Sequence, residues 1–295
     1  MQKKILVIGS VSIDNTIFTK QLPSTGTTTV ADSYFQNIGG KGANQACASL
    51  FLGGDVSFIG AIGKDHNGDM VEKFLKEQGL HARLKRSEKP TGIAFIILEE
   101  ETAENRILII QGANTDLQIE DIDKNLDLFT EGDILLTQFE NDMETVSYVI
   151  KKAHEKHMLV VVNPAPIKEL KEEYYQYIDY LVPNEHELEA LSHKTDILLA
   201  AKELLSRGAK NVIVTLGEKG SVLINKDEYI KVEPHKVDAV DTTAAGDSYL
   251  GALVTKLSEN KSIKEAMEFA SLCSSKTVTK KGAIVSLPHL DELQD

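Results

Sequence analysis

The stretch "DILLTQFENDMETVSYVIKKAHEKHMLVVVNP" (residues 133–164) contains two short runs rich in Leu, Ile and Val, with an amphipathic segment between them. Residues 133–139 and 158–164 are apolar on both faces, which is typical of strands buried within a parallel sheet. Residues 142–156 have helical periodicity. A strand, a helix and a second strand in this order predict one parallel α/β unit.

The same alternation continues along the chain and predicts a doubly wound α/β fold, with a mostly parallel sheet flanked by helices. Further strands are expected at 4–9, 56–63, 179–184 and 211–217, and further helices at 40–52, 67–79 and 196–207. Two regions depart from this rhythm. Residues 15–36 and 91–111 alternate with period two and have no helix between their strands, so we expect them to form a small separate sheet.

Composition excludes several classes of protein. The chain has 295 residues and a net charge of −13, which argues against binding to nucleic acids or anionic membranes. No apolar run has the roughly 18 residues of a membrane span, and the N-terminus does not resemble a signal peptide. Cys47 and Cys273 lie in apolar periodic segments and are expected to be buried thiols. These features predict a cytoplasmic protein.

Polar residues cluster where the predicted strands end, which is the usual ligand-binding edge of such sheets. Ser12 and Asp14 follow the first strand, and Glu140 follows the strand at 133–139. The segments "NPAP" (163–166), "PNEHE" (183–187) and "TLGEKG" (215–220) follow three others. We expect "TLGEKG" to be a hairpin turn whose glycines also admit a flat ligand.

The segment "GGKGANQ" (39–45) is neither a P-loop nor a GxGxxG motif, which disfavours a dinucleotide-dependent dehydrogenase. Its glycines permit close approach of the backbone to a ligand, although they are also common before ordinary helices. Lys41 and Asn44 are three residues apart and share one side of the predicted helix start. A cation beside an amide suits a polyhydroxylated ligand.

Two helix starts allow both a structural and a functional interpretation. Asn184 is a good N-cap, and we favour that role on spacing alone, but Asn184 and Glu187 could also hold Mg²⁺ or its waters. In "VDTTAAGDSYLGA" (240–252), Asp247 could simply complement the helix dipole. Alternatively, the N–H groups of Ala244, Ala245, Gly246 and Asp247 could form an anion hole for a phosphoryl group, with Asp247 accepting the proton of a hydroxyl.

Taken together, "GGKGANQ", "NPAP", "PNEHE", "TLGEKG", "DTTAAGDSYLGA" and "KKGAIVS" (280–286) resemble the ribokinase-like (PfkB-type) sugar kinases in order and spacing, over essentially the whole chain. The resemblance implies one ATP-dependent kinase domain over 1–295. Its sheet would be Rossmann-like, with a small β-sheet lid, formed by strands within about 15–36 and 91–111, through which the chain would pair as a homodimer.

The resemblance also implies roles for individual residues. Asp247 would be the catalytic base. Sugar-contacting positions would be Ser12, Asp14, Gly40, Lys41, Asn44, Glu140 and Asp247 itself. ATP-binding positions would be Asn184, Thr215, Gly217, Gly220, Gly246 and Ser271, with Glu187 completing a Mg²⁺ motif. A K⁺ site would comprise Asp241, Thr243, Thr277, Lys280, Gly282 and Ser286, mostly through backbone carbonyls.

Two departures from the family pattern bear on the ligands. Ser12 stands where an Asn is usual, and Ser271 stands where Asn or His is frequent. The expected reaction is transfer of the ATP γ-phosphate to the 5-hydroxyl of D-ribose. Fructose, deoxyribose or a nucleoside are alternative acceptors, and a non-catalytic sugar- or nucleotide-binding regulator is an alternative function. A phosphorylated sugar is disfavoured because Lys41 is the one evident cation.

Overall fold

The large sheet forms the centre of the molecule in the computed structural model, which describes residues 2–99 and 104–293. Its strand order is β13-β12-β11-β10-β9-β8-β1-β4-β5. The strands are β1 (Lys4–Ile8), β4 (Asp55–Gly63), β5 (His81–Ser87), β8 (Ile134–Gln138), β9 (Leu159–Asn163), β10 (Tyr180–Leu181), β11 (Asn211–Thr215), β12 (Ser221–Ile224) and β13 (Tyr229–Val232). Neighbours are parallel except in the β11–β12 and β12–β13 pairs, so the predicted doubly wound α/β fold is confirmed.

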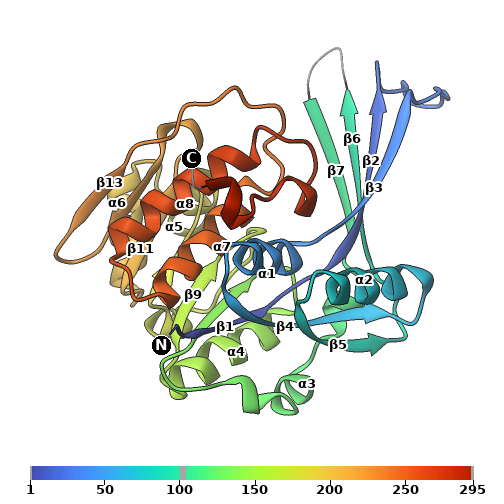
Figure 1. Cartoon of the computed structure of the whole chain (residues 1–295). Helices are drawn as coiled ribbons and strands as arrows, with labels where there is room; N and C mark the ends of the chain where they lie inside the picture. The colour runs from blue at the N-terminus through green and yellow to red at the C-terminus, as the bar shows by residue number, and fades with distance from the viewer. Residues whose placement is uncertain (1, 100–103, 294–295) are drawn as a thin grey trace.

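Helices cover both faces of this sheet, as Figure 1 shows. One layer consists of α1 (Lys41–Phe51), α2 (His66–Glu77), α7 (Ala245–Ser258) and α8 (Ile263–Thr277). The other consists of α3 (Ile119–Asp123), α4 (Met143–Glu155), α5 (Glu185–Ser192) and α6 (Ile197–Ser206). Alternate residues of β1 divide between the two cores: Ile5 and Val7 face the first layer, and Leu6 and Ile8 face the second. This explains why the strands are apolar on both faces.

A separate small sheet projects from one side of the body (Figure 1). It has the order β3-β2-β6-β7 and contains β2 (Ser12–Thr19), β3 (Ser33–Gly39), β6 (Gly92–Glu99) and β7 (Glu104–Ile110). The sheet lid expected as part of the fold class is therefore present. The turn expected inside 91–111 includes residues 100–103, which lie outside the described residues.

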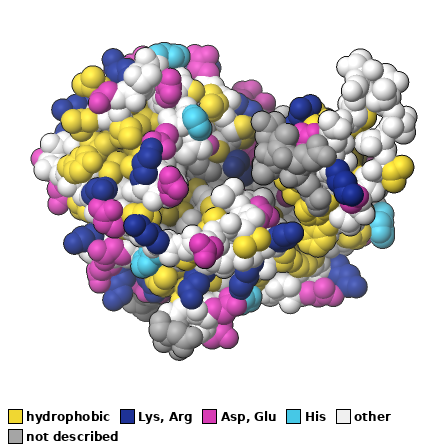
Figure 2. All heavy atoms as spheres, turned by 90° about the horizontal axis from the view of Figure 1, so that it is seen from above, with side chains coloured by type: hydrophobic (Ala, Val, Ile, Leu, Met, Phe, Trp, Pro, Cys, Tyr) yellow, Lys and Arg dark blue, Asp and Glu magenta, His cyan; other side chains and the backbone are white. Residues whose placement is uncertain are grey.

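The surface carries charges of both signs (Figure 2), although the net charge is −13. Figure 2 shows acidic and basic side chains interspersed on the face seen from above. Of the helices in the described part of the chain, none combines the length and the apolarity that crossing a bilayer demands.

Candidate active site

Asp247 lies in the first turn of α7 and is 6% exposed. The helix begins after Ala244, whose φ of 59° is in the left-handed region that a non-glycine residue seldom adopts. A Cβ added at Gly246 would meet no atom within 4 Å, so open space adjoins this turn. An unusual backbone angle beside open space at a helix N-terminus is typical of a binding site for a negatively charged group.

The carboxylate of Asp247 is held by two amides from α1. Asn44 Nδ2 donates to Oδ2 at 2.8 Å, and Gln45 Nε2 donates to Oδ1 at 2.9 Å. The helices α1 and α7 pack together along the sheet, which brings residues about 200 positions apart into contact. Asn44 Oδ1 is buried and has no hydrogen-bond partner among the described residues. An unpaired buried acceptor at this place suits a hydroxyl donor from a ligand.

Glycines determine how α1 starts. Gly40 is its N-cap with a φ of 89°, and a Cβ there would lie 2.7 Å from Val11 Cα. Gly40 therefore meets both the conformational and the steric requirement for glycine. Burial lowers the pKa of Lys41, the first helical residue, but neighbouring carboxylates outweigh that effect and raise its pKa above the ordinary value. These carboxylates belong to Asp247, Glu140 and Glu187.

A cavity of about 1220 Å³ lies between the small sheet and the body. It is lined by all seven of the predicted sugar-contacting residues, namely Ser12, Asp14, Gly40, Lys41, Asn44, Glu140 and Asp247. The cavity-facing side of the small sheet contributes apolar residues, including Ile96 and Ile107. Lys168 and Lys281 also line this cavity. The expectation that Lys41 is the one evident cation was therefore wrong, because residues distant in sequence converge here.

Asp14 is a carboxyl group of this cavity with a perturbed pKa. Burial raises its pKa to about 6, and the charges of Glu140 and Asp247 add to the increase. Ser12 Oγ donates to Asp14 Oδ1 at 2.7 Å, which opposes the shift. Gly39 makes room for the carboxylate, because a Cβ there would lie 1.9 Å from Asp14 Oδ2.

Glu140 connects the cavity to the start of α1. Its Oε2 accepts the backbone N–H of Lys41 at 3.1 Å and also the hydroxyl of Ser10. The carboxylate thus stabilises the positive end of the helix while it borders the cavity.

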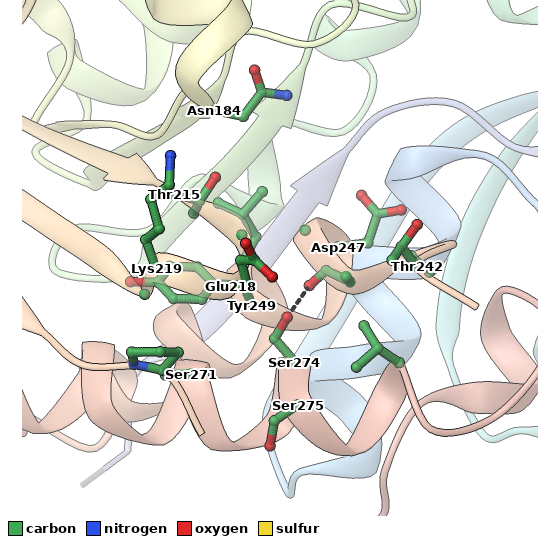
Figure 3. A pocket seen from close by; sticks show the side chains of 18 of the residues that line it. Asn184, Thr215, Glu218, Lys219, Thr242, Asp247, Tyr249, Ser271, Ser274 and Ser275 are labelled. Atoms are coloured by element: carbon green, nitrogen blue, oxygen red, sulfur yellow. Dashed lines mark hydrogen bonds between the residues drawn. The ribbon is translucent and has the colours of Figure 1, made fainter. Parts of the chain in front are cut away.

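A second cavity, of about 1070 Å³, lies on the other side of the α7 N-terminus. All of the predicted nucleotide-binding residues line it: Asn184, Thr215, Gly217, Gly220, Gly246 and Ser271. The hairpin between β11 and β12 forms one wall, as expected for "TLGEKG". In Figure 3, Asp247 and Thr242 lie near each other on one side, while Ser271 and Ser274 lie along α8; the dashed line joins Ser274 Oγ to the carbonyl of Ala245 at 3.0 Å.

Asn184 caps α5, as favoured from its spacing. Its Oδ1 accepts the N–H of Glu187 at 2.8 Å, and Glu187 Oε2 accepts the N–H of Asn184 at 2.9 Å. Burial raises the pKa of Glu187. No cluster of three or more metal-ligating side chains occurs within residues 2–99 and 104–293. A cation held here would therefore need ligands from water or a bound phosphate in addition to this pair.

The other aspartate of "VDTTAAGDSYLGA", Asp241, joins two loops. Its Oδ1 accepts the N–H of Thr243, and its Oδ2 accepts the N–H of Gly282, each at 2.9 Å. Thr277 and Ser286, which lie close in sequence to Gly282, are both fully buried. Thr277 Oγ1 lies 2.7 Å from Ser248 Oγ of α7. The Lys280 ammonium pairs with Glu292 at 2.8 Å, which leaves its backbone carbonyl for any role at the predicted K⁺ site.

Sequence reasoning missed three buried amides behind Asp247, namely Gln45, Gln138 and Asn163. Gln45 and Asn163 stand inside the quoted segments "GGKGANQ" and "NPAP", so their position beside candidate residues was the available signal. Gln138 had a weaker one, because it ends a strand of apolar residues.

Comparison with known proteins identifies the family of this chain. Residues 2–290 match the pfkB family of carbohydrate kinases. The chain is 38% identical to a ribokinase of Schizosaccharomyces pombe, over 98% of this chain and 96% of that protein. It is 34% identical to a deoxyribokinase of Salmonella typhi, over 99% and 97%.

Solved structures of two ribokinases have the same fold as this chain. A ribokinase from Thermotoga maritima superposes with a TM-score of 0.91 at 39% identity, covering 99% of this chain and 98% of that one. An Arabidopsis thaliana ribokinase complexed with ribose and ATP superposes with a TM-score of 0.89 at 29% identity, covering 99% and 98%. The chain therefore belongs to the pfkB family of carbohydrate kinases.

Proposed function

We propose that this protein is an ATP-dependent ribokinase that transfers the γ-phosphate of ATP to the 5-hydroxyl of D-ribose. One observation carries the proposal. Four residues, Lys41, Thr242, Ala244 and Asp247, line both cavities, so a carboxylate and a helix N-terminus stand at the junction between them. A hydroxyl on one side and a phosphate on the other would meet at this junction.

Each group at the junction has a chemical role in the proposed transfer. Asp247 accepts the proton of the attacking hydroxyl. This proton transfer occurs late, because phosphoryl transfer has a loose transition state. The N–H groups of Ala244, Ala245, Gly246 and Asp247 stabilise the negative charge on the transferring phosphoryl group. Asn44, with its unpaired Oδ1, accepts a hydrogen bond from a sugar hydroxyl.

Mg²⁺ fits the residues at the start of α5. Glu187 Oε1 has no hydrogen-bond partner among the described residues, and burial disfavours the charge of this carboxylate. A hydrated cation beside Glu187 and Asn184 would relieve that cost. When bound with ATP, Mg²⁺ neutralises phosphate charge.

K⁺ fits the loops that Asp241 joins, because a carboxylate and backbone carbonyls are ligands of suitable chemistry for a hard cation. We propose that this site comprises Asp241, Thr243, Thr277, Lys280, Gly282 and Ser286. The loops flank the start of α7: Asp241 precedes it, and Thr277 contacts Ser248 within it. A bound cation would order the anion-binding turn, so initial rates should be higher in K⁺ than in Na⁺ or in cation-depleted buffer.

The acceptor is assigned to ribose because ribokinases are frequent among the relatives and because one of them is complexed with ribose and ATP. Deoxyribose is the principal alternative, since a deoxyribokinase is similar to nearly the same extent. Ser12 is the residue most relevant to this choice, because its hydroxyl is already bonded to Asp14. Lys168 and Lys281 also leave an acceptor with an anionic group open to test.

A coupled ADP-release assay tests the function directly. Ribose, deoxyribose, fructose, phosphorylated sugars and nucleosides are compared at equal concentrations, and ribose is expected to give the highest kcat/KM. A higher value for another acceptor would replace ribose. Turnover of no acceptor, combined with measurable sugar or ATP binding, would favour the regulator instead.

We further propose that the chain acts as one kinase domain, in the cytoplasm, as a homodimer paired through the small sheet. Cys47 and Cys273 are both free and buried, which suits a reducing compartment. The homodimer is argued below from the exposed face of that sheet.

A further inference from the structure

We infer that Gln45 is a positioning residue that fixes the orientation of the Asp247 carboxylate, and that Gln138 and Asn163 hold Gln45 in place. The inference rests on the proposed function, in which Asp247 accepts the proton. It concerns residues behind the reacting group. None of them lines the cavity between the small sheet and the body, which we call the sugar cavity. The inference makes the carboxyl edge of the large sheet part of the catalytic apparatus.

Four side chains form a continuous chain of hydrogen bonds. Gln138 Nε2 donates to Gln45 Oε1 at 2.6 Å, and Gln45 Nε2 donates to Asp247 Oδ1 at 2.9 Å. Gln45 Nε2 also donates to Asn163 Oδ1 at 3.3 Å. Gln45 and Gln138 are 0% exposed, and Asn163 is 7% exposed. Bulk water therefore does not compete for the amides of Gln45 and Gln138, whereas Asn163 borders the second cavity.

The polarity of this chain follows from the chemistry of its last member. An ionised carboxylate only accepts hydrogen bonds, so Gln45 must turn its amide nitrogen toward Asp247. Its second N–H then reaches Asn163, and its oxygen accepts from Gln138. A reversed Gln45 amide would place its oxygen against acceptors of both Asp247 and Asn163. The amide is thus locked in one orientation.

The sheet anchors the far end of the chain. Gln138 and Asn163 are the last residues of β8 and β9 and are paired in register. Asn163 Nδ2 donates to the carbonyl of Val182 at 3.1 Å, just beyond β10. Gln138 lies against Gly9, where an added Cβ would be 2.0 Å from Gln138 Oε1. The amides therefore sit on rigid elements rather than on loops.

One feature of Gln138 indicates that this polarity has a cost. Its Oε1 is buried and has no hydrogen-bond partner among the described residues. A buried acceptor without a donor is unfavourable, yet turning this amide over would deprive Gln45 Oε1 of its donor. The unpaired oxygen thus belongs to Gln138, which hydrogen-bonds to Gln45 and not to Asp247 itself.

Asn44 and Gln45 consequently have different roles, although both donate to Asp247. Asn44 lines the sugar cavity and has an unpaired oxygen there, so it is placed to contact a substrate. Gln45 lines neither large cavity within the described residues and acts through Asp247 alone. Removing Gln45 should therefore affect turnover without a matching effect on substrate binding.

The test compares steady-state kinetics of the full-length enzyme over a range of pH. Gln45→Met keeps the side-chain length and removes the donor to Asp247. Loss of one charged hydrogen bond and of the carboxylate orientation should lower kcat by about tenfold or more, with both KM values changed by less than about threefold. The acid limb of kcat should move to higher pH, because a carboxylate that loses an N–H donor has a higher pKa.

Gln138→Met provides a second variant, which keeps the inference testable if Gln45→Met does not fold. It leaves the bond between Gln45 and Asp247 possible but unlocks the Gln45 amide. The loss of kcat and the shift of the acid limb should therefore have the same direction as in Gln45→Met and a smaller size.

Ser49→Ala is the matched control. Ser49 lies one turn after Gln45 on α1, is 0% exposed, and its Oγ is 2.7 Å from Thr255 Oγ1 of α7. The substitution removes another buried hydrogen bond between the same two helices, so it should lower Tm without moving the acid limb of kcat. Identical kinetics in Ser49→Ala and Gln45→Met would overturn the positioning role.

Asp247→Asn separates this inference from the proposed function. An inactive Asp247→Asn beside a Gln45→Met with wild-type kcat and wild-type pH dependence would refute the role of Gln45 alone. An Asp247→Asn that keeps most of its activity would remove Asp247 as the base, and the positioning role with it.

Discussion

Asp14 shows how one half-buried carboxyl group links the sugar cavity to pH. Burial and two neighbouring carboxylates raise its pKa to about 6 from 3.8, so it changes protonation near physiological pH. The ionised form accepts hydrogen bonds from sugar hydroxyls with both oxygens, while the protonated form has lost an acceptor. In the proposed function, this position is therefore a titratable part of the acceptor site.

The first prediction concerns sugar binding. As pH falls below about 6, Asp14 becomes protonated, and KM for the sugar should rise by up to about tenfold per pH unit while KM for ATP changes less. Steady-state kinetics between pH 5 and 8 measure this, with assay pH values chosen around the midpoint. Asp14→Asn should have a raised KM that no longer depends on pH in this range.

Ser12→Ala supplies the control for the cause of that midpoint. The hydroxyl of Ser12 donates to Asp14 Oδ1 and favours the ionised form, so its removal should move the midpoint to higher pH. An unchanged midpoint in Ser12→Ala, or a KM independent of pH in the wild type, would contradict the assignment to Asp14.

The second prediction concerns stability, where the sign differs from that of an ordinary paired carboxylate. Between pH of about 4 and 6 the folded state binds more protons at Asp14 than the unfolded chain, because the folded pKa is raised. Its contribution to the free energy of unfolding therefore decreases as pH rises through this window. Denaturant titrations should give the wild type and Asp14→Asn similar free energies of unfolding at low pH. Above pH 6 the variant should have the higher free energy of unfolding.

At the scale of single residues, the sequence was informative about which residues line the cavities and uninformative about their mutual contacts. Asp14 and Asp247 follow strand ends or start helices, so local pattern sufficed to select them. The bond from Gln45 to Asp247 spans 202 positions, and its polarity depends on Gln138 and Asn163 from two other strands. Local patterns contain no information about such register.

Among the elements, α1 depends on close contact with the link that follows β1. A Cβ at Gly42 would lie 2.6 Å from the carbonyl carbon of Gly9 and from the nitrogen of Ser10, both of them backbone atoms. Ala43 N also donates to the Ser10 carbonyl at 2.9 Å. The helix can approach this backbone only because Gly42 lacks a side chain.

The third prediction uses two glycines that differ in their surroundings. Gly42→Ala must push α1 away from the backbone at Gly9, so it should lower the free energy of unfolding by about 2–3 kcal/mol or more. Gly246→Ala meets no atom within 4 Å and should leave stability nearly unchanged, because the helix accepts alanine readily. Chemical denaturation of both variants measures the difference.

Gly246→Ala, which should leave stability nearly unchanged, should nevertheless lower activity. The methyl group of Gly246→Ala would occupy the open space at the anion-binding turn, so kcat/KM for ATP should fall in a protein that remains fully folded. Wild-type kinetics in Gly246→Ala would show that no phosphate approaches this turn.

Prediction of the elements succeeded where burial produces a pattern. β1, β4, β8, β9 and β11 were found as apolar runs because helices cover both of their faces. β5, with the sequence "HARLKRS", was missed, since it is an edge strand with mostly half-exposed polar residues. The antiparallel β12 and β13 were also missed; a hairpin turn was expected, but neither strand was assigned.

At the scale of the whole molecule, the small sheet has more apolar surface than one cavity requires. Ile96, Leu98 and Ile107 face the sugar cavity. The opposite face shows Tyr34 at 59% exposure and Leu108 at 64%. The four-stranded sheet thus has apolar residues on both faces, and only one face is turned toward the body of its own chain.

A second copy of the chain is the occupant that we propose for this face. Exposed apolar patches on a soluble protein mark association surfaces, and most homo-oligomers pair the same patch on each subunit. The small sheet projects away from the body, so its outer face is not covered by the large sheet of the same chain (Figure 1).

The fourth prediction follows from that arrangement. Sedimentation should give the wild type a mass twice the 32.4 kDa of the chain, and Leu108→Glu should shift it toward the monomer because a charge would be buried at the interface. Leu199→Glu is the matched control: Leu199 is 56% exposed on α6, far along the chain from the small sheet, so the dimer should persist. A monomeric wild type, or a Leu108→Glu protein that remains a dimer, would remove the small sheet as the interface.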